Sequence, residues 1–237
     1  STLLASSAAS DVYKRQILNN VFYNGAVQTS SILLNLLLMP YITRILGKDA
    51  LGINSFGQAI VGYFVLLGNL GITIYGAKAI AERRDDKNSK QQKFAECVTY
   101  QFFFNLIAIL LYNSWVIFQG YYIYFLFNII ILTSMTDLSW AYTGMERFDL
   151  IAVRNLIIKI VGTLLIFLFV KQQEDLSLFI IIQQGVLLIS NVVFWFELDK
   201  LEIVPRFSSL TLSLKSIFKP AIFVFIPSIF TSLYLSL

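Results

Sequence analysis

Seven long apolar segments restrict the fold of this chain more than any other feature of its sequence. A helix needs about 20 apolar residues to cross a bilayer, and only helices and closed barrels satisfy their backbone groups there. Hydrophobic residues make up 57% of the chain and charged residues only 14%, against about 45–50% and 25% in soluble domains. The sequence therefore predicts an all-α, polytopic membrane helix bundle. The segments lie near residues 17–40, 51–76, 94–118, 121–143, 150–170, 177–197 and 217–237.

Polar residues in the first segment fall on one side of the expected helix. Asn20, Asn24, Gln28, Ser31 and Asn35 are spaced by four, four, three and four residues. At about 100° per residue they form a stripe about 80° wide. Amide and hydroxyl groups at membrane depth need a protein partner or a water-filled cavity. The stripe therefore indicates the core of a transporter.

The second segment repeats this pattern. A close helix–helix contact through small and polar residues would explain it, but matching stripes on two adjacent helices favour a shared cavity. The third segment has a weaker polar stripe, for which packing alone is an equal alternative, and the sixth carries further amides. The residues of the second segment lie within about 100° of one another and are Asn54, Gln58, Asn69 and Thr73, with Gly62 and Gly76 on the same side.

Glycine and proline mark the expected helix ends. Pro40 is expected to end the first helix, and Gln119–Gly120 leaves room only for a tight hairpin between the third and fourth helices. Trp140 and Tyr142 are expected at the membrane interface as anchors, although Trp140 could also line the cavity.

Basic residues are divided unequally between alternate loops. If the N-terminus is cytoplasmic, the outer loops carry only Arg44, Lys48 and Lys171, and Lys159 lies within a helix. Every other Lys and Arg is then on the inner side, as the positive-inside rule requires. The basic run at 78–93 is interpreted as a solvated loop that fixes this topology, and no nucleic-acid partner is expected.

Three charged residues are expected at membrane depth: Asp137, Arg154 and Lys159. An isolated charge at a helix centre costs about 2.5–3.5 kcal/mol on insertion scales, so we expect Asp137 to be paired. Counted from a turn near 144–146, Arg154 is level with Asp137 and is the first candidate partner, with Lys159 the second. A locking ion pair and a role in coupling-ion or substrate binding are both open.

The sequence offers little for catalysis or metal binding. Histidine is absent, which removes histidine bases and ligands, and the single Cys97 cannot form an internal disulfide. Residues 71–78 superficially resemble a phosphate-binding loop, but that motif needs Gly-Lys-Ser/Thr after a strand. We expect no enzyme, no catalytic residue, no cofactor and no metal site.

Three separated blocks of sequence resemble the Wzx-type polysaccharide flippases of the multidrug/oligosaccharidyl-lipid/polysaccharide exporter superfamily. They are MPYITRILGKDALGINSF (39–56), LGITIYGAKAIAERR (70–84) and DLSWAYTGMERFDLIAVRNLIIKIVG (137–162). Their order and spacing agree with that family, and the resemblance covers residues 17–237. The residues that carry it include Pro40, Arg44, Gly47, Gly52, Trp140, Gly144, Glu146, Arg154 and Asn155.

The resemblance implies about twelve to fourteen helices in two pseudo-symmetric lobes around a central cavity. This chain would supply the first six-helix lobe plus part of helix seven, in a bacterial cytoplasmic (inner) membrane with the N-terminus cytoplasmic. Residues 1–16 match no signal peptide and are expected to be a non-native or disordered leader. The expected division is 1–16 leader, 17–197 first lobe, 198–216 cytoplasmic linker and 217–237 truncated start of the second lobe.

The resemblance further implies a secondary transporter that flips lipid-linked oligosaccharide, a polyprenyl-diphosphate-sugar, for O-antigen, capsule or exopolysaccharide synthesis. Sugars need amide and hydroxyl partners, and a diphosphate needs basic ones. Membrane lipid, a coupling H⁺ or Na⁺, and functional association with polysaccharide polymerase and glycosyltransferases are also expected. The candidate residues are Asn20, Asn24, Gln28, Asn35, Arg44, Asn54, Gln58 and Asn69 for the substrate cavity, and Asp137, Arg154 and Lys159 for charge or coupling.

Three alternatives remain open at this point. A drug or cation antiporter of the same superfamily would favour membrane carboxylates, of which Asp137 is the only plausible one. A membrane enzyme of polysaccharide assembly, such as a polymerase or acyltransferase, would need a large outer loop or a histidine-containing site. A non-transporting scaffold would leave the two polar stripes without a purpose.

Overall fold

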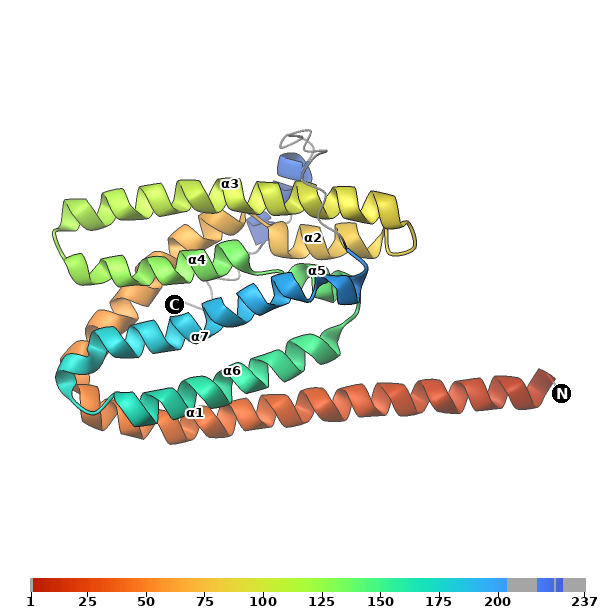
Figure 1. The fold of residues 1–237 in the computed structure, drawn as a ribbon, viewed down its shortest axis with the longest axis horizontal. Coiled ribbons are helices and arrows are strands. Elements are labelled where there is room, and N and C mark those ends of the chain that lie inside the picture. The colour runs from red at the N-terminus through yellow and green to blue at the C-terminus, as the bar shows by residue number, and fades with distance from the viewer. Residues whose placement is uncertain (1, 204–216, 224, 228–237) are drawn as a thin grey trace.

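The computed structural model describes residues 2–203, 217–223 and 225–227, with side chains from residue 29 onward except at 31. Within these ranges every regular element is helical, which confirms the all-α prediction (Figure 1). The elements are α1 (Thr2–Asn69), α2 (Ile72–Ala81), α3 (Lys87–Gln119), η1 (Tyr122–Phe127), α4 (Asn128–Thr136), α5 (Ser139–Gly144), α6 (Phe148–Phe169), η2 (Gln173–Asp175), α7 (Leu176–Phe196) and η3 (Leu198–Leu201).

Five described stretches are long and apolar enough to cross a membrane. They are Ile32–Ala81, Lys87–Gln119, Tyr122–Gly144, Phe148–Phe169 and Gln173–Phe196. The first is 50 residues long and contains a break, after which the orange part of α1 turns back along the bundle in Figure 1. That stretch therefore makes two passes, in agreement with the separate first and second helices expected from the sequence.

The break in α1 lies at Gly47 and not at Pro40. The helix continues through Pro40, and Gly47 adopts φ 73° and ψ 175°. Positive φ strains any residue with a Cβ, which is why glycine occupies such positions. A Cβ at Gly47 would also lie 2.6 Å from Nε2 of Gln173. The expectation that Pro40 ends the first helix is wrong, because a long packed helix accommodates one missing N–H.

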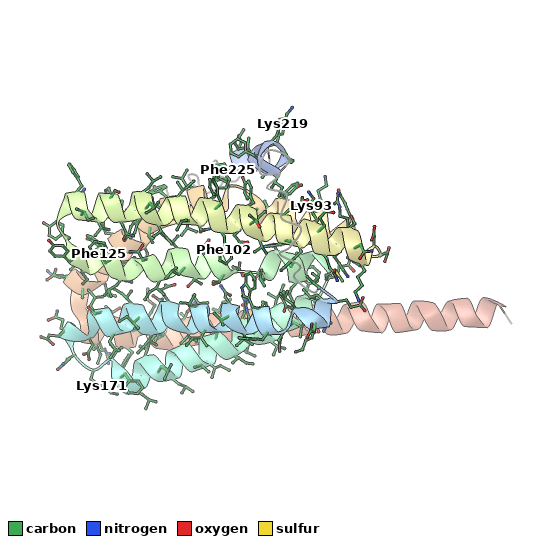
Figure 2. All side chains as sticks on the ribbon, turned by 45° about the horizontal axis from the view of Figure 1, so that its top comes forward. Lys93, Phe102, Phe125, Lys171, Lys219 and Phe225 are labelled. Carbon is green, nitrogen blue, oxygen red and sulfur yellow. The ribbon has the colours of Figure 1, made fainter. Side chains whose placement is uncertain are left out.

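Most connections between helices gather at two ends of the bundle, whereas those between α1 and α2 and between α4 and α5 lie within it (Figure 1). One end carries the turns at 82–86 and 145–147 together with η3. The other carries Gly47, the α6–η2 turn and Gly120, whose left-handed φ of 75° ends α3 and confirms the tight hairpin. Figure 2 places Lys93 toward the first end and Lys171 at the second. The predicted inner loops thus share one end, and the predicted outer loops share the other.

Two apolar clusters hold these ends together. α1 packs against α3, α4 and α6, α7 packs against α4 and α6, and α2 packs against α3 and α5. The first cluster lies toward the 82–86 turn and the second toward Gly47. The first includes Ile72, Phe94, Tyr100, Leu138, Trp140, Tyr142 and Phe194; the second includes Leu46, Val61, Tyr112, Phe127, Ile131 and Ile166.

Trp140 and Tyr142 belong to the core, so the prediction that they anchor the interface is wrong. Their exposed fractions are 1% and 0%. Tyr142 stacks on Phe194 with 4.0 Å between ring centroids and donates a hydrogen bond to the Phe194 carbonyl at 2.9 Å. A Cβ on Gly76 would lie 2.7 Å from the Trp140 ring. The glycine therefore provides the space that the indole fills.

The backbone of residues 2–16 is the start of α1 and extends beyond the other helices in Figure 1. Residues 217–223 and 225–227 are helical, whereas 204–216 and 228–237 lie outside the described residues. The division into leader, first lobe, linker and second-lobe start stays a prediction.

Candidate functional site

A layer of polar side chains separates the two apolar clusters, and we call it the polar belt. Its members come from α1, α3, α4, α5, α6 and α7. Most are partly or fully buried, so they bond to protein groups rather than to bulk water. The polar belt consists of Asn69, Gln101, Asn105, Ser134, Asp137, Ser139, Arg154 and Asn191.

The polar belt is centred on a break between α4 and α5. Asp137 leaves the helix with φ −72° and ψ 118°. Its Oδ1 accepts hydrogen bonds from the backbone N of Ser139 at 3.0 Å and from Ser139 Oγ at 2.5 Å. An aspartate that accepts from the backbone two residues later forms a turn that starts a new helix. The single helix expected at 121–143 is therefore divided into η1, α4 and α5, and the break at Asp137 separates α4 from α5.

Gln101 of α3 satisfies two of the carbonyls that this break releases. Its Nε2 donates to the carbonyls of Ser134 at 2.7 Å and Asp137 at 2.9 Å. Its Oε1 accepts from Trp140 Nε1 at 2.8 Å, and only 2% of Gln101 is exposed. One buried amide therefore joins α3 to both sides of the break.

Two side chains of α7 satisfy two further carbonyls near the end of α4. Asn191 Nδ2 donates to the Thr133 carbonyl at 2.7 Å, and Trp195 Nε1 donates to the Thr136 carbonyl at 2.9 Å. Irregular backbone at membrane depth persists only where protein or a cavity satisfies it. Side chains of neighbouring helices therefore stabilise the break. Discontinuous helices of this kind form binding sites in secondary transporters.

Asparagines extend the polar belt to α1. Asn105 is fully buried and donates to the carbonyls of Gly68 at 3.1 Å and Gln101 at 2.9 Å. Ser134 Oγ donates to Asn69 Oδ1 at 2.8 Å. Asn69, a predicted cavity residue, is therefore a structural partner of α4 at this level.

Arg154 of α6 lies at the centre of the charged part of the polar belt. Its Nη1 donates to Asn191 Oδ1 at 2.9 Å, and its Nη2 donates to Ser139 Oγ at 3.2 Å. The guanidinium carbon lies 4.3 Å from the centroid of the Phe194 ring. Asp137 Oδ1 is 3.9 Å from Nη1, which confirms the predicted pairing of Asp137 with Arg154.

This ion pair leaves donor capacity on the arginine. The 3.9 Å contact is at the limit of an ion pair and is not bidentate. The Nε atom of Arg154 is buried and has no acceptor among the described residues. Because Nε is still free to donate a hydrogen bond, the arginine can bind a further anionic or hydroxyl group.

Lys159 is not the partner of Asp137. It is five residues beyond Arg154 on α6, so it points about 140° away around the helix. Within the described part of the chain it has no ion pair, and it is partly exposed. The direction in which each side chain points around α6 therefore selects Arg154 over Lys159. The distance of each residue from the turn near 144–146 does not include that direction.

The predicted stripe residues separate into different surroundings. Asn54 and Gln58 lie together, because Gln58 Nε2 donates to Asn54 Oδ1 at 3.2 Å and to Gln183 Oε1 of α7 at 3.3 Å. Asn35 and Arg44 are exposed. The side chains of Asn20, Asn24 and Gln28 lie outside the described residues. Their substrate roles stay predictions.

A groove of about 400 Å³ runs between α6 and α7, and we call it the α6–α7 groove. Arg154 and Ser190 line its polar part, and Glu197 and Lys200 lie at the end near η3. Its remaining lining is apolar and consists of Leu150, Val153, Ile157, Ile158, Val161, Val186, Ile189, Val193 and Phe194.

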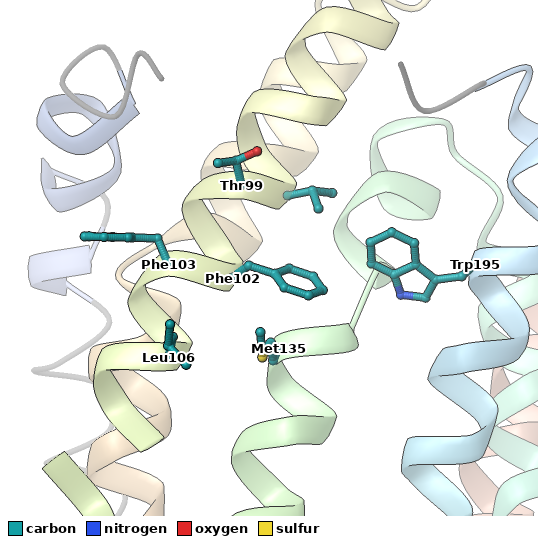
Figure 3. A pocket seen from close by; sticks show the side chains of 7 residues that line it. Thr99, Phe102, Phe103, Leu106, Met135 and Trp195 are labelled. Atoms are coloured by element: carbon teal, nitrogen blue, oxygen red, sulfur yellow. The ribbon is translucent and has the colours of Figure 1, made fainter. Parts of the chain in front are cut away.

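A second depression, of about 410 Å³, lies among α3, α4 and α7. Figure 3 shows Phe102 and Trp195 facing each other across it, with Met135 below. The two rings are edge-on, with 5.9 Å between their centroids. Thr99 supplies its single hydroxyl among the described lining residues, so it lacks the polar groups that a sugar or phosphate site needs.

An ion pair joins two turns at the end of the bundle that carries the basic loops. Arg84 Nη2 lies 2.9 Å from Glu146 Oε1 and donates to the Gly144 carbonyl at 3.1 Å. The hydrogen bond from Arg84 lowers the pKa of the Glu146 carboxyl below its usual range. Glu146 is one of the few residues other than glycine with positive φ, at 56°, so this pair ties a tight turn to the 82–86 turn.

The break itself was missed from the sequence, as were the roles of Ser139 and Trp195. The residues 137–139 carry the available signal, because an aspartate often accepts a hydrogen bond from the backbone N–H two residues later and so forms a turn. Neither glycine nor proline marks the position, so the apolar run around it conceals the break.

Five described stretches that are long and apolar enough to cross a membrane, the first of them broken at Gly47, surround a partly buried polar layer. They define a polytopic membrane protein with a polar interior, an architecture that transporters use. The family model described as "Polysaccharide biosynthesis protein" matches residues 17–237. This chain belongs to that family of polysaccharide biosynthesis proteins, so the resemblance carried by the three sequence blocks is confirmed.

A protein of Escherichia coli (strain K12) named "Putative O-antigen transporter" is 25% identical to this chain over 185 residues. The match covers 76% of the chain and 45% of that relative. The chain therefore spans less than half the length of the curated relative that it matches. No solved structure gives a significant match.

Proposed function

We propose that this chain contributes one lobe of a secondary transporter that flips polyprenyl-diphosphate-linked oligosaccharides across the bacterial inner membrane. The transporter has its N-terminus in the cytoplasm and supplies O-antigen, capsule or exopolysaccharide synthesis. It acts after glycosyltransferases and before a polysaccharide polymerase, and it catalyses no covalent step. Family membership and the relative's name support this proposal.

The observation that carries the proposal is the state of Arg154. It is a largely buried cation beside a helix break, its contact with Asp137 is 3.9 Å long, and its Nε is unpartnered among the described residues. A diphosphate offers pairs of oxygen acceptors that the planar guanidinium fork binds in a bidentate manner. Asp137 alone is too distant to use that capacity.

A transport cycle follows from this arrangement. Binding of the diphosphate draws Arg154 from Asp137 and leaves the carboxylate without its cation. Release of the substrate on the outer side restores the pair. The discontinuous α4–α5 unit, held by side chains of α3 and α7, can then rearrange between two states without exposing backbone groups.

Variants at Arg154 test this function. In a strain whose gene is replaced, Arg154→Ala is expected to reduce surface polysaccharide about ten- to hundredfold, the worth of a charged hydrogen-bond partner at about 1.5–3 kcal/mol. Arg154→Lys should restore only part, because a lysine lacks the planar fork. Lys87→Ala is the control, since Lys87 is exposed at the start of α3.

The amount of surface polysaccharide is measured on gels, and the amount of the protein is measured by immunoblots of the membrane fraction. Normal polysaccharide from Arg154→Ala at a normal protein level would refute the role of Arg154. Unchanged polysaccharide with altered drug susceptibility would instead favour the antiporter of the same superfamily, whose cation site would be Asp137.

A further inference from the structure

We propose that the α6–α7 groove binds the phosphate end of a polyprenyl phosphate together with the adjoining part of its hydrocarbon chain. This inference rests on the proposed function and adds the place where the lipid part of the substrate sits. It starts from the distribution of polar and apolar residues along the groove.

The walls of the groove are apolar and open. Ile157 on α6 is 55% exposed, and Ile189 and Val193 on α7 are 67% and 48% exposed. The α6 wall from Leu150 to Val161 is about 16 Å long at 1.5 Å per residue. A hydrocarbon chain lying along this wall would cover these side chains.

The charged end of the groove matches a phosphate. Arg154 and Lys200 are cations, and Glu197 is the carboxylate that lines the groove with them, 2.6 Å from Lys200. Asp137 lies behind Arg154 at 3.9 Å. Two buried polar atoms of lining residues, Arg154 Nε and Ser190 Oγ, have no hydrogen-bond partner among the described residues. Both can donate to a phosphate oxygen, and hydrogen bonds to a charged acceptor are stronger than those between neutral groups.

The direction of the groove agrees with the orientation of a lipid. Its charged end lies beside η3 and the 145–147 turn, which is the end predicted to be cytoplasmic, and its apolar end lies deeper in the bundle. A lipid in the inner leaflet has its phosphate and its chain in the same order. Its volume of about 400 Å³ is in the range of small-molecule pockets, about 300–1,000 Å³, so it holds only the part of the lipid next to the phosphate.

Photocrosslinking in nanodiscs tests this placement. The protein carries a photoreactive amino acid at Ile157, inside the groove, or at Ile160, a 41% exposed residue of the same helix that does not line it. The probes are a polyprenyl phosphate, the matching polyprenol without phosphate, and phosphatidylglycerol as an ordinary anionic lipid. We expect an adduct of polyprenyl phosphate at position 157 at least fivefold more abundant than with polyprenol or at position 160.

Matched variants show whether the groove itself binds the probe. Val193→Trp fills the groove and is expected to lower the adduct yield at least fivefold, as is Arg154→Gln. Val192→Trp is the control, because Val192 is 41% exposed on the same helix and does not line the groove. Equal yields from the two tryptophan variants would overturn the proposal, as would equal labelling by polyprenol or full competition by phosphatidylglycerol.

The failure of this inference and that of the proposed function are distinguishable. If Val193→Trp leaves crosslinking unchanged while Arg154→Ala still abolishes surface polysaccharide, the groove assignment falls and the transport function stands. If crosslinking follows the expected pattern but none of these variants changes surface polysaccharide, lipid binding stands and the flippase function falls.

Discussion

Replacement of Gln101 by methionine should destabilise the helix bundle more than any other single amide substitution in the polar belt. Methionine keeps the length of the side chain but removes its three hydrogen bonds. The carbonyls of Ser134 and Asp137 and the Trp140 indole then lose their common partner. Because Gln101 is only 2% exposed, water cannot replace that partner without opening the bundle.

The size of the effect follows from the number of bonds. Interhelical hydrogen bonds in membrane proteins contribute about 0.6 kcal/mol on average and up to about 1.7 kcal/mol. Three bonds therefore give a loss of about 2–5 kcal/mol in the free energy of unfolding. Part of this loss falls on the α4–α5 break, because Gln101 joins its two sides.

Gln92→Met on the same helix is the matched control. Gln92 is exposed and makes one hydrogen bond, to Glu96 Oε1 at 3.1 Å, so its replacement should change stability by less than about 0.5 kcal/mol. Reversible unfolding of the purified protein in mixed detergent–lipid micelles, followed by tryptophan fluorescence and by circular dichroism, measures both variants. A Gln101→Met variant as stable as Gln92→Met would refute the assignment of Gln101 as the amide that supports the break.

Two further predictions concern packing and pH. Gly76→Ala should destabilise the protein by about 1–3 kcal/mol, because the added Cβ overpacks against Trp140. Gly62→Ala should stabilise its helix by up to about 1 kcal/mol, because its Cβ would meet nothing within 4 Å. Equal unfolding midpoints for the two variants would contradict this prediction. The lowered pKa of Glu146 means that its pair with Arg84 stabilises the fold above the unfolded-state pKa of about 4.3 and that this contribution is lost as pH falls through the lower folded-state value. The stability difference between wild type and Glu146→Gln should therefore be present at pH 7 and shrink as the pH is lowered below the unfolded-state pKa, and a difference that stays constant as the pH is lowered would count against the pair.

Much of the architecture followed from the sequence because it depends on local composition. Apolar length determined which segments form membrane helices, and the distribution of basic residues sorted the loops into two sets that the structure places at opposite ends. Counting along two helices from their shared turn made Arg154 the first candidate partner of Asp137, and the structure confirms that pair. Each of these inferences needs only the rise of a helix and the cost of a charge in hydrocarbon.

The polar stripes of the helices determined less of the structure. Each stripe shows which amides need hydrogen-bond partners, but a water-filled cavity and a neighbouring helix can both supply those partners. Gln58 donates to both Asn54 and Gln183 of α7, and Ser134 donates to Asn69. Which helix lies opposite each stripe depends on packing between segments far apart in the chain. The spacing of polar residues along one helix carries no information about that packing.

The sequence by itself determined that this chain is a bundle of membrane helices, which end carries its basic loops, and that Asp137 must be paired. Only the tertiary structure decided that α4 breaks at Asp137, that Gln101, Asn191 and Trp195 cap the released carbonyls, and that Trp140 is buried. The physical reason is that hydrophobicity acts on each segment alone, whereas a backbone break inside a membrane is stable only when side chains from other helices supply its missing hydrogen bonds.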